Sequence, residues 1–341
     1  MLVMTPPTTL PASRVPDPRQ APPLRWGVMG PGWIASRFVG ALQKHTAQQV
    51  TAVGSRDLAR AASFAQQWGV DVAVEGYEAV AERPDVDVVY VATTHDTHAD
   101  LAILAMESGK HVLVEKPLAT NAGDARKIAE VAVATDRYCA EALWTLYLPK
   151  WDVLRQLLDD CALGRLRSIS GEYGEHFTGD HRIFDPALAG GPLLDLGIYP
   201  LSMITSLVGP PTTLTASGTA HPTGVTGQVA VTMTHDDDVL SSFWTTMYGA
   251  ARNDLRLVGD DAVLVVEPVH NGPGPMTWSS ADGSRVLAYE EPSALHVDGL
   301  HFQAAEAARR IAAGERETPM RPLSDSIVAL EAVDAIVAVT S

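Results

Sequence analysis

A lysine, an aspartate and a tyrosine in this chain have the types and spacing that acid–base chemistry on a carbonyl group would use. Lys116 follows the short apolar run His111–Val114, which is typical of a buried strand. A cation there can polarise a carbonyl oxygen or lower the pKa of a neighbouring proton donor. Asp195 and Tyr199 are four residues apart and share one face if their segment is helical. The competing interpretations are a salt bridge at a domain edge for Lys116 and ordinary aromatic packing for Tyr199.

The segment that carries Asp195 has one helix signal in favour and one against. Pro192 suits the first turn of a helix that starts after Gly190-Gly191. Pro200 removes a helical hydrogen bond and should kink the segment. The sequence therefore predicts a kinked helix at this site.

A glycine-rich turn near the N-terminus predicts a phosphate-binding loop. The segment Gly30-Pro31-Gly32-Trp33-Ile34-Ala35 follows an apolar strand and opens a helix, in the G-x-G-x-x-A form of the dinucleotide fingerprint. The first glycine permits the tight turn, the second lets the backbone approach the pyrophosphate, and the small alanine lets the helix pack on the strand. The helix N-terminus faces the phosphate charge. The alternative is a glycine-rich turn without a ligand.

The end of the second strand indicates which dinucleotide binds. An NAD site usually has Asp or Glu there, about 20 residues beyond the fingerprint, for the ribose hydroxyls. This chain has Gly54-Ser55-Arg56 instead. A guanidinium can pair with a 2′-phosphate and a serine hydroxyl adds a donor, which favours NADP over NAD. In the alternative, Arg56 is a solvated surface residue and Asp57, at an expected helix N-cap, is a displaced ribose ligand.

The elements that position these residues fall into two domains. From Leu24 to about Trp144, six apolar runs alternate with amphipathic helical stretches, which predicts a Rossmann-type parallel sheet covered on both faces. The predicted strands are Leu24–Met29, Val50–Gly54, Val70–Val74, Val86–Ala92, His111–Val114 and Tyr138–Leu143. The predicted helices are Asp57–Trp68, Ala99–Ser108 and Asn121–Ala134.

After a predicted helix at Pro149–Cys161 the pattern changes to strands with partial alternation. Runs of strands after a doubly wound half indicate a mostly antiparallel second sheet, with a hairpin turn at Asp236–Asp238. The predicted strands are Leu166–His176, Thr212–His221, Gln228–His235, Leu240–Met247, Leu255–Val258 and Ala262–Glu267, followed by helices at Leu300–Gly314 and Leu323–Val339. The expected division is a disordered tail over 1–22, a nucleotide-binding domain over 23–145 and a substrate and oligomerisation domain over 146–341.

Composition excludes several classes of protein. The formal net charge of −16 argues against nucleic-acid and anionic-membrane partners. Two cysteines cannot form a disulfide framework, so the cytoplasm is the simplest compartment. The sequence contains no run of about 18 apolar residues, so we expect no transmembrane helix. The first 22 residues contain six of the 23 prolines, which favours a disordered tail. His176 and His181, with Asp180 nearby, fit no specific metal-ligand spacing, so we expect no metal.

Three further segments complete a recognisable pattern: Glu115-Lys116-Pro117, Glu141-Ala142-Leu143-Trp144, and Gly190 to Pro200 with the sequence GGPLLDLGIYP. Together with the fingerprint they resemble the Gfo/Idh/MocA oxidoreductase family from about Leu24 onward. The tyrosine form of the last motif is similar to the glucose–fructose oxidoreductase, dimeric dihydrodiol dehydrogenase and xylose dehydrogenase branch. The resemblance implies a Rossmann domain, an open sheet domain and an active site in the cleft between them.

The resemblance and the local pattern together give a set of candidate site residues. Lys116, Asp195 and Tyr199 would be catalytic, and Trp144 and Arg182 would flank the substrate, although Arg182 could equally be a surface residue. Thr93, His98 and Glu115 are expected near the cofactor, where His95 and His98 could instead cap a helix. Trp33 would shield the pyrophosphate or simply pack the first helix. The candidate cofactor-binding residues are Gly30, Gly32, Trp33, Ile34, Ala35, Ser55, Arg56, Thr93, His98, Glu115 and Lys116.

These observations predict an NADP-dependent oxidoreductase acting on a sugar-like or cyclic diol substrate. In the reducing direction Tyr199 would donate the proton, Lys116 would stabilise the developing alkoxide, and Asp195 would orient the substrate or tune Lys116. The alternatives are a sugar-nucleotide ketoreductase of a deoxysugar pathway and a catalytically silent NADP-binding regulator. Apolar residues in Val229–Met233 and Ser242–Met247 would need a partner, so we expect a homo-oligomer, a dimer joined through the C-terminal sheets.

Overall fold

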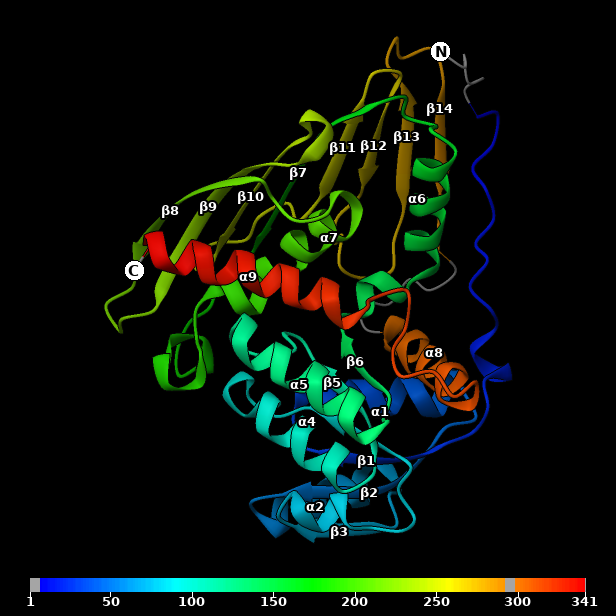
Figure 1. The fold of residues 1–341 in the computed structure, drawn as a ribbon, viewed down its shortest axis with the longest axis vertical. Helices are drawn as coiled ribbons and strands as arrows, with labels where there is room; N and C mark the ends of the chain where they lie inside the picture. The colour runs from blue at the N-terminus through cyan, green and yellow to red at the C-terminus, as the bar shows by residue number, and fades with distance from the viewer. Residues whose placement is uncertain (1–6, 292–297, 341) are drawn as a thin grey trace. The chain divides into compact units, whose positions relative to one another are not determined.

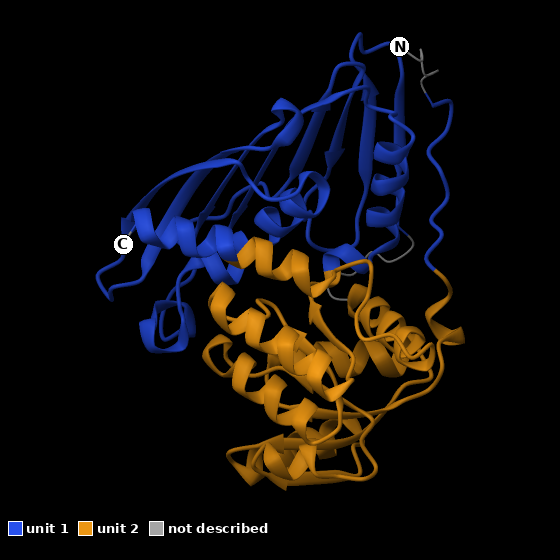
Figure 2. Cartoon of the chain, viewed as in Figure 1, with its two compact units in different colours: residues 1–15, 145–296, 331–341 blue, residues 16–144, 297–330 orange. Residues whose placement is uncertain are grey.

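The computed structural model describes residues 7–291 and 298–340. Its contacts divide the chain into two compact units, drawn in different colours in Figure 2. The first, called here the sheet unit, contains residues 1–15, 145–296 and 331–341. The second, called the Rossmann unit, contains residues 16–144 and 297–330, so the segment that carries α8 (His301–Ala312) belongs with the N-terminal sheet.

All six predicted N-terminal strands are present and parallel. Their order is β3-β2-β1-β4-β5-β6, which is that of a Rossmann fold. The strands are β1 (Arg25–Met29), β2 (Gln49–Ser55), β3 (Val72–Glu75), β4 (Val88–Val91), β5 (His111–Glu115) and β6 (Cys139–Ala142). Every residue of β4 and β6 is buried, as expected of a sheet covered on both faces.

The helices of the Rossmann unit follow the predicted amphipathic stretches (Figure 1). Asp57 and Asn121 are N-caps, because their side chains accept the backbone N–H of Ala59 and Asp124. The short helix α3 was not predicted. Besides α8, the helices are α1 (Trp33–His45), α2 (Leu58–Trp68), α3 (Glu78–Ala81), α4 (His98–Glu107) and α5 (Ala122–Thr135).

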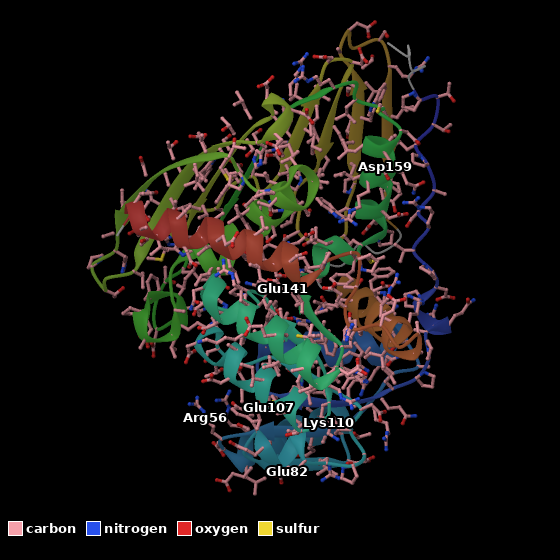
Figure 3. The ribbon with its side chains drawn as sticks, viewed as in Figure 1. Arg56, Glu82, Glu107, Lys110, Glu141 and Asp159 are labelled. Carbon is pink, nitrogen blue, oxygen red and sulfur yellow. The ribbon has the colours of Figure 1, made fainter. Side chains whose placement is uncertain are left out.

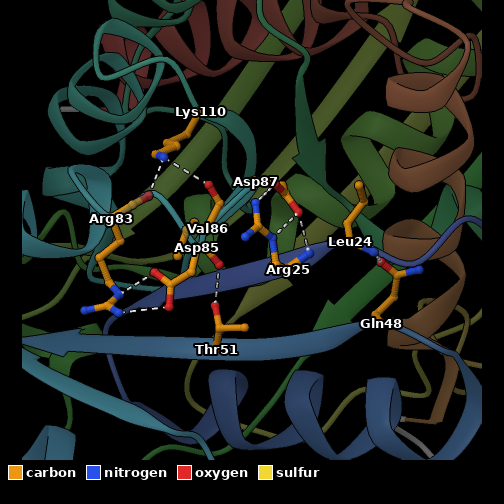
Figure 4. A network of polar contacts seen from close by, with 9 residues as sticks. All are labelled: Leu24, Arg25, Gln48, Thr51, Arg83, Asp85, Val86, Asp87 and Lys110. Carbon is orange, nitrogen blue, oxygen red and sulfur yellow. Dashed lines mark hydrogen bonds and ion pairs between the residues drawn. The ribbon is translucent and has the colours of Figure 1, made fainter.

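A polar network fastens the amino ends of the parallel strands (Figure 4). The Arg25 guanidinium donates to both carboxylate oxygens of Asp87, at 2.6 and 3.0 Å. Lys110, just before β5, donates from Nζ to the carbonyls of Arg83 and Val86. These bonds lie at the edge of the sheet opposite the phosphate loop, so they hold the strands without occupying the ligand edge.

The sheet unit has eight strands in the order β14-β13-β12-β11-β7-β10-β9-β8. The sheet is mostly antiparallel, as predicted, and among the described residues only β7 and β10 pair in parallel. The hairpin turn at Asp236–Asp238 joins β9 to β10 as expected. The strands are β7 (Leu166–Gly174), β8 (Thr213–Ala220), β9 (Thr226–Thr234), β10 (Leu240–Thr246), β11 (Leu255–Gly259), β12 (Ala262–Val266), β13 (Met276–Ser280) and β14 (Val286–Tyr289), of which β13 and β14 were not predicted.

The alternating burial of β9 corrects one expectation. Val229, Val231 and Met233 are each 2% exposed, inside the sheet unit, whereas Ala230 and Thr232 point to the open face. The apolar residues of this strand therefore already pack within the unit, because strand side chains alternate between faces. In the other expected segment, Ser242–Met247, Phe243 and Met247 are buried and Trp244 is 40% exposed. The remaining helices are α6 (Pro149–Asp159), α7 (Ile198–Val208) and α9 (Leu323–Thr340).

The helix that carries the candidate tyrosine starts with a π turn. Leu193–Gly197 forms this turn and α7 follows directly, so the helical segment continues through Pro200. The segment Pro186–Val208 is long and apolar enough to span a membrane by length and composition alone. Within the fold, 72% of its most apolar window is buried, which is the property of a core helix.

The N-terminal segment follows a defined path from residue 7, although its composition favours a disordered tail. Arg14 forms an ion pair with Asp152 of α6 at 2.7 Å. Arg309 of α8 donates to the carbonyl of Asp17, and Ala21 is buried against alanines of the same helix. The ion pair of Arg14, the hydrogen bond from Arg309 and the burial of Ala21 therefore hold this segment in place.

Candidate active site

The glycine turn after β1 has the geometry that a dinucleotide phosphate requires. Gly30 has φ +94°, and a Cβ there would lie 2.7 Å from the carbonyl oxygen of Ala92, so only glycine fits. At Gly32 a Cβ would meet nothing nearer than 3.9 Å, which leaves open space beside the backbone. No side chain caps the first turn of α1, so its N–H groups remain available to an anion. These residues therefore fit a bound dinucleotide.

The other fingerprint residues differ in their surroundings. Ala35 is fully buried and lets α1 pack on the sheet, while Ile34 is half-buried. Trp33 is 62% exposed, and the Arg37 guanidinium lies 5.7 Å from its ring centroid. This exposure means that Trp33 does not pack α1 against the core, which leaves the shielding role as its candidate function.

The end of β2 separates the roles of Ser55, Arg56 and Asp57. Asp57 caps α2 by accepting the Ala59 N–H at 2.8 Å, and its own N–H donates to Ser55 Oγ at 3.2 Å. Arg56 is exposed at the surface of the Rossmann unit (Figure 3) and makes no ion pair within the described residues. Asp57 is thus engaged in the helix, whereas the Arg56 guanidinium remains available to an anion.

His98 joins the loop after β4 to the turn after β5. It is fully buried, and Nδ1 donates to the Pro117 carbonyl at 2.7 Å because a carbonyl can only accept. Its Nε2 faces the Thr93 carbonyl at 3.3 Å. His95 is buried beside it, with ring centroids 5.7 Å apart. His98 therefore positions two backbone segments beside the candidate cofactor site: the loop after β4 and the turn after β5.

The carboxylate before Lys116 is held in an apolar setting. The Tyr90 hydroxyl donates to Glu115 Oε1, and the Lys116 N–H donates to Glu115 Oε2 at 3.2 Å. Burial raises the pKa of Glu115 to about 7. Lys116 itself is half-buried at the carboxyl end of β5, and its peptide bond to Pro117 is cis.

A second buried carboxylate, whose role was not predicted, fixes the turn that follows Lys116. Glu141 Oε1 accepts the Leu118 N–H at 3.0 Å, and Oε2 accepts Arg321 Nε at 2.8 Å and the Ser326 hydroxyl at 2.6 Å. Arg321 is fully buried and Glu141 is 1% exposed, which makes their ion pair a costly one to break. Figure 3 labels Glu141 in the Rossmann unit. The partners are 180 residues apart, so sequence spacing gave no sign of the pair.

In the sheet unit the structure joins two of the candidate residues. Asp195 Oδ1 accepts the Arg182 guanidinium at 2.8 Å, and the two side chains are 11% and 32% exposed. The π turn carries Asp195, and Tyr199 follows on the first turn of α7 with 7% exposure. Trp144, which ends the first segment of the Rossmann unit, is 5% exposed. Lys116 belongs to the Rossmann unit, whereas Asp195, Tyr199 and Arg182 belong to the sheet unit.

The histidines considered as metal ligands bind backbone groups instead. His176 Nδ1 bonds the Tyr248 carbonyl at 2.8 Å, and His181 Nδ1 accepts the Ile183 N–H at 3.2 Å. Across the described residues no group of three or more His, Cys, Asp or Glu side chains is arranged to hold a metal ion.

Two family models match most of the chain. Residues 24–142 match the model described as an oxidoreductase family with an NAD-binding Rossmann fold, and residues 151–265 match the GFO/IDH/MocA C-terminal domain. The chain belongs to the GFO/IDH/MocA family of oxidoreductases. The family resemblance predicted from the four motifs is confirmed.

Known relatives are dehydrogenases and ketoreductases. Trans-1,2-dihydrobenzene-1,2-diol dehydrogenase from Bos taurus is 33% identical over 319 residues, covering 89% of this chain and 92% of the relative. The Homo sapiens enzyme of the same name is 31% identical over 323 residues, with the same coverage. A solved 3-ketoreductase from Actinomadura kijaniata, in complex with NADP and TDP-benzene, has TM-score 0.83 and 27% identity, covering 94% of this chain and 98% of that one.

A further solved structure supports the fold. Levoglucosan dehydrogenase in complex with NADH and levoglucosan has TM-score 0.84 at 19% identity, covering 93% of this chain and 97% of that one. Together these findings establish an NAD(P)-dependent oxidoreductase that acts on CH–OH groups. The predicted enzyme class and nicotinamide cofactor are therefore confirmed.

Proposed function

We propose that the protein interconverts an alcohol and a carbonyl on a cyclic diol or monosaccharide-like substrate, with NADP as the preferred cofactor. The observation that carries the proposal is the shared edge of the Rossmann sheet. Gly30 follows the carboxyl end of β1 and Lys116 follows that of β5, with only β4 between these strands. Ligands of open α/β sheets bind outside these carboxyl ends. Lys116 thus stands at the edge where the phosphate loop begins.

The chain's own residues supply binding and proton transfer. The bound nicotinamide would supply or accept the hydride. Lys116 stabilises the negative charge that develops on the substrate oxygen, and Tyr199 donates the proton to that oxygen in the reducing direction. Asp195, paired with Arg182, orients the substrate. The proposal thus assigns charge stabilisation to Lys116 of the Rossmann unit and proton donation to Tyr199 of the sheet unit.

The preference for NADP rests on the residues after β2. Arg56 is exposed and without an ion pair in the described part of the chain, while Asp57 caps α2. A guanidinium at this place complements a 2′-phosphate, and a carboxylate that would accept ribose hydroxyls is engaged elsewhere. Ser55, 4% exposed, contributes mainly to the shape of the turn.

A sugar-nucleotide ketoreductase is the second candidate function. The solved 3-ketoreductase that carries TDP-benzene matches 94% of this chain at 27% identity. The two candidates differ in substrate size, because a nucleotide-linked sugar needs a second anion-binding region beside the hydride-transfer site.

We also propose a cytoplasmic homodimer joined through the open faces of the sheet units. That face has a groove of about 530 Å³ lined mainly by small and polar side chains of β7 to β11. Trp244 lies in the groove and is 40% exposed, and Glu172 and Arg256 add charges of both signs. A surface with both signs can complement its own copy across a two-fold axis. Free Cys139 and Cys161 are compatible with a reducing compartment.

The test of the catalytic proposal is substitution of the proton donor. Tyr199→Phe keeps the ring but removes the hydroxyl, and it should lower turnover by about 10²–10⁴-fold with NADPH affinity retained. Lys116→Met should cost a comparable amount, and the double variant should be far from additive. Turnover would be measured with NADPH or NADP against monosaccharides, keto-sugars, cyclic diols and nucleotide-linked sugars. Near wild-type turnover in Tyr199→Phe would remove this residue from the mechanism.

A further inference from the structure

Tyr199 contacts a series of buried side chains in the sheet unit. The ring of Tyr173, on the central strand β7, meets the ring of Tyr199 edge to face, with centroids 5.6 Å apart and planes at 66°. Both tyrosines are less than one tenth exposed. Such an arrangement is favourable between aromatic rings and restricts the rotation of both.

Tyr173 also contacts two residues that follow β12. Asn271 Nδ2 donates to its hydroxyl at 3.2 Å, and the His270 ring packs against it with centroids 5.4 Å apart. His270 is fully buried, and its Nε2 donates to the Glu172 carbonyl at 3.0 Å. Burial lowers the pKa of His270 to about 3, so the ring is neutral and has one tautomer.

The loop between β12 and β13 that carries His270 and Asn271 is tied to the start of the sheet unit. The Thr145 hydroxyl donates to the Asn271 carbonyl at 2.6 Å, and Lys150 Nζ donates to the Gly272 carbonyl. Thr145 and Lys150 are fully buried. Buried hydrogen bonds thus fix this loop, and its contacts with Tyr173 hold the tyrosine ring in one position.

Tyr173 is poorly suited to donate protons itself. Burial raises its pKa well above the ordinary value, and the neighbouring Tyr199 and Glu175 raise it further. A hydroxyl that resists ionisation remains neutral while its neighbour exchanges a proton. Its chemical contribution is therefore to the placement of Tyr199.

We propose that Tyr173, anchored by Asn271, is a positioning residue that holds the Tyr199 phenol in the orientation from which it protonates the substrate. This inference rests on the proposed role of Tyr199. Without the contact from Tyr173, the Tyr199 phenol could rotate away from the reacting oxygen. A misplacement of about 1 Å can lower the rate about 10²-fold.

The experiment compares Tyr173 variants in two backgrounds. In the otherwise unchanged enzyme, Tyr173→Leu removes the ring and should lower kcat about 10- to 100-fold, with the NADPH Kd unchanged. Tyr173→Phe keeps the ring contact and loses only the hydroxyl with its bonds to Asn271 and Glu175, so the fall in kcat should be smaller. In the Tyr199→Phe background neither substitution should lower kcat further, because the group they position is already gone.

Controls separate positioning from general damage. Tyr289→Phe alters a tyrosine of the same unit on the distant strand β14 and should leave kcat unchanged. Thermal unfolding would be followed for every variant, and Tyr173→Phe carries the test if Tyr173→Leu does not fold. Adding Asn271→Leu to Tyr173→Phe should not lower kcat further, because both substitutions break the same hydrogen bond between Tyr173 and Asn271.

Three outcomes would overturn the inference. Equal fold-losses from Tyr173→Leu in the two backgrounds would indicate a merely structural role. A loss in Tyr173→Phe as large as that in Tyr199→Phe would make Tyr173 a proton donor. Unchanged kcat in both Tyr173 variants would leave Tyr199 positioned by other contacts. By contrast, normal turnover in Tyr199→Phe alone would contradict the proposed role of Tyr199 as proton donor, and not only the positioning role of Tyr173.

Discussion

The Arg182 guanidinium donates to the Asp195 carboxylate at 2.8 Å and so joins the loop before Gly190 to the π turn before Tyr199. From the sequence, both residues were expected near the substrate, with Asp195 alternatively tuning Lys116, and their pairing was not predicted. Their contact means that the charge of Asp195 is already balanced within the sheet unit. A substrate that meets either residue therefore meets an ion pair, which offers both a donor and an acceptor to neighbouring hydroxyl groups.

We expect the pair to act as one group in substrate binding. Arg182→Ala and Asp195→Asn should each raise the substrate KM about 10- to 100-fold, the range of one charge-assisted hydrogen bond. The double variant should be little worse than either single variant. Steady-state kinetics of the four enzymes measures this, with Arg167→Ala as a control because it breaks the exposed Arg167–Asp260 ion pair. Fully additive losses would indicate that the two residues contact the substrate independently.

Assembly gives a second prediction. If the open sheet faces pair, Trp244→Glu places a charge in the groove of each copy and should convert a dimer into a monomer. Val133→Glu, a change at an exposed valine of α5, should leave the assembly unchanged. Light scattering at micromolar concentration distinguishes the two states. A wild-type monomer, or a Trp244→Glu variant that remains dimeric, contradicts pairing through this face.

The extent of prediction from sequence differs between elements and contacts. The six parallel strands were recognisable because each is an apolar run between helical stretches, and Asp57 was recognisable as a helix N-cap from its local pattern. Strands β13 and β14 were missed because the prolines and glycines of residues 272–275 resemble a loop that continues onward. A local pattern reports on a residue's own neighbours in the chain.

The candidate site divides in the same way. The phosphate loop lies within one turn, so its glycines could be interpreted from spacing alone. The bonds that hold the site join distant residues: Glu141 to Arg321 across 180 positions, and Tyr173 to Asn271 across 98. Nothing in the segments around Arg321 or Asn271 identifies the partner. Only the fold brings these side chains together.

Cofactor choice gives a third prediction. Arg56→Ala should weaken NADP binding by about 1.5–3 kcal/mol, or about one to two decades, because it removes charge-assisted bonds to the 2′-phosphate. NAD lacks this group and should bind almost unchanged. Ser55→Asp with Arg56→Ala should shift the preference further, since a carboxylate repels the phosphate and accepts ribose hydroxyls.

Titration of both cofactors against each variant tests this expectation. Arg19→Ala is the matched control, because Arg19 is also an exposed arginine of the Rossmann unit and lies outside the phosphate loop. Equal small losses for NAD and NADP, or a wild type that already prefers NAD, would contradict the assignment of Arg56.

The buried carboxyl of Glu115 predicts how stability depends on pH. Burial raises its pKa from the ordinary 4.5 to about 7, so the folded protein retains a proton that the unfolded chain has released. Between these two pH values the folded state binds more protons, and stability should fall as pH rises through that window. Glu115→Gln keeps the shape without the charge, so it should be stabilised relative to wild type above pH 7, by up to about 3 kcal/mol. At pH 4 the two proteins should be equally stable.

Chemical denaturation across pH 4–8 measures the difference, and the exposed Glu130→Gln should follow the wild-type curve. Parallel curves for wild type and Glu115→Gln would mean that Glu115 ionises normally in the folded protein, with its bonds to Tyr90 and the Lys116 N–H offsetting its burial.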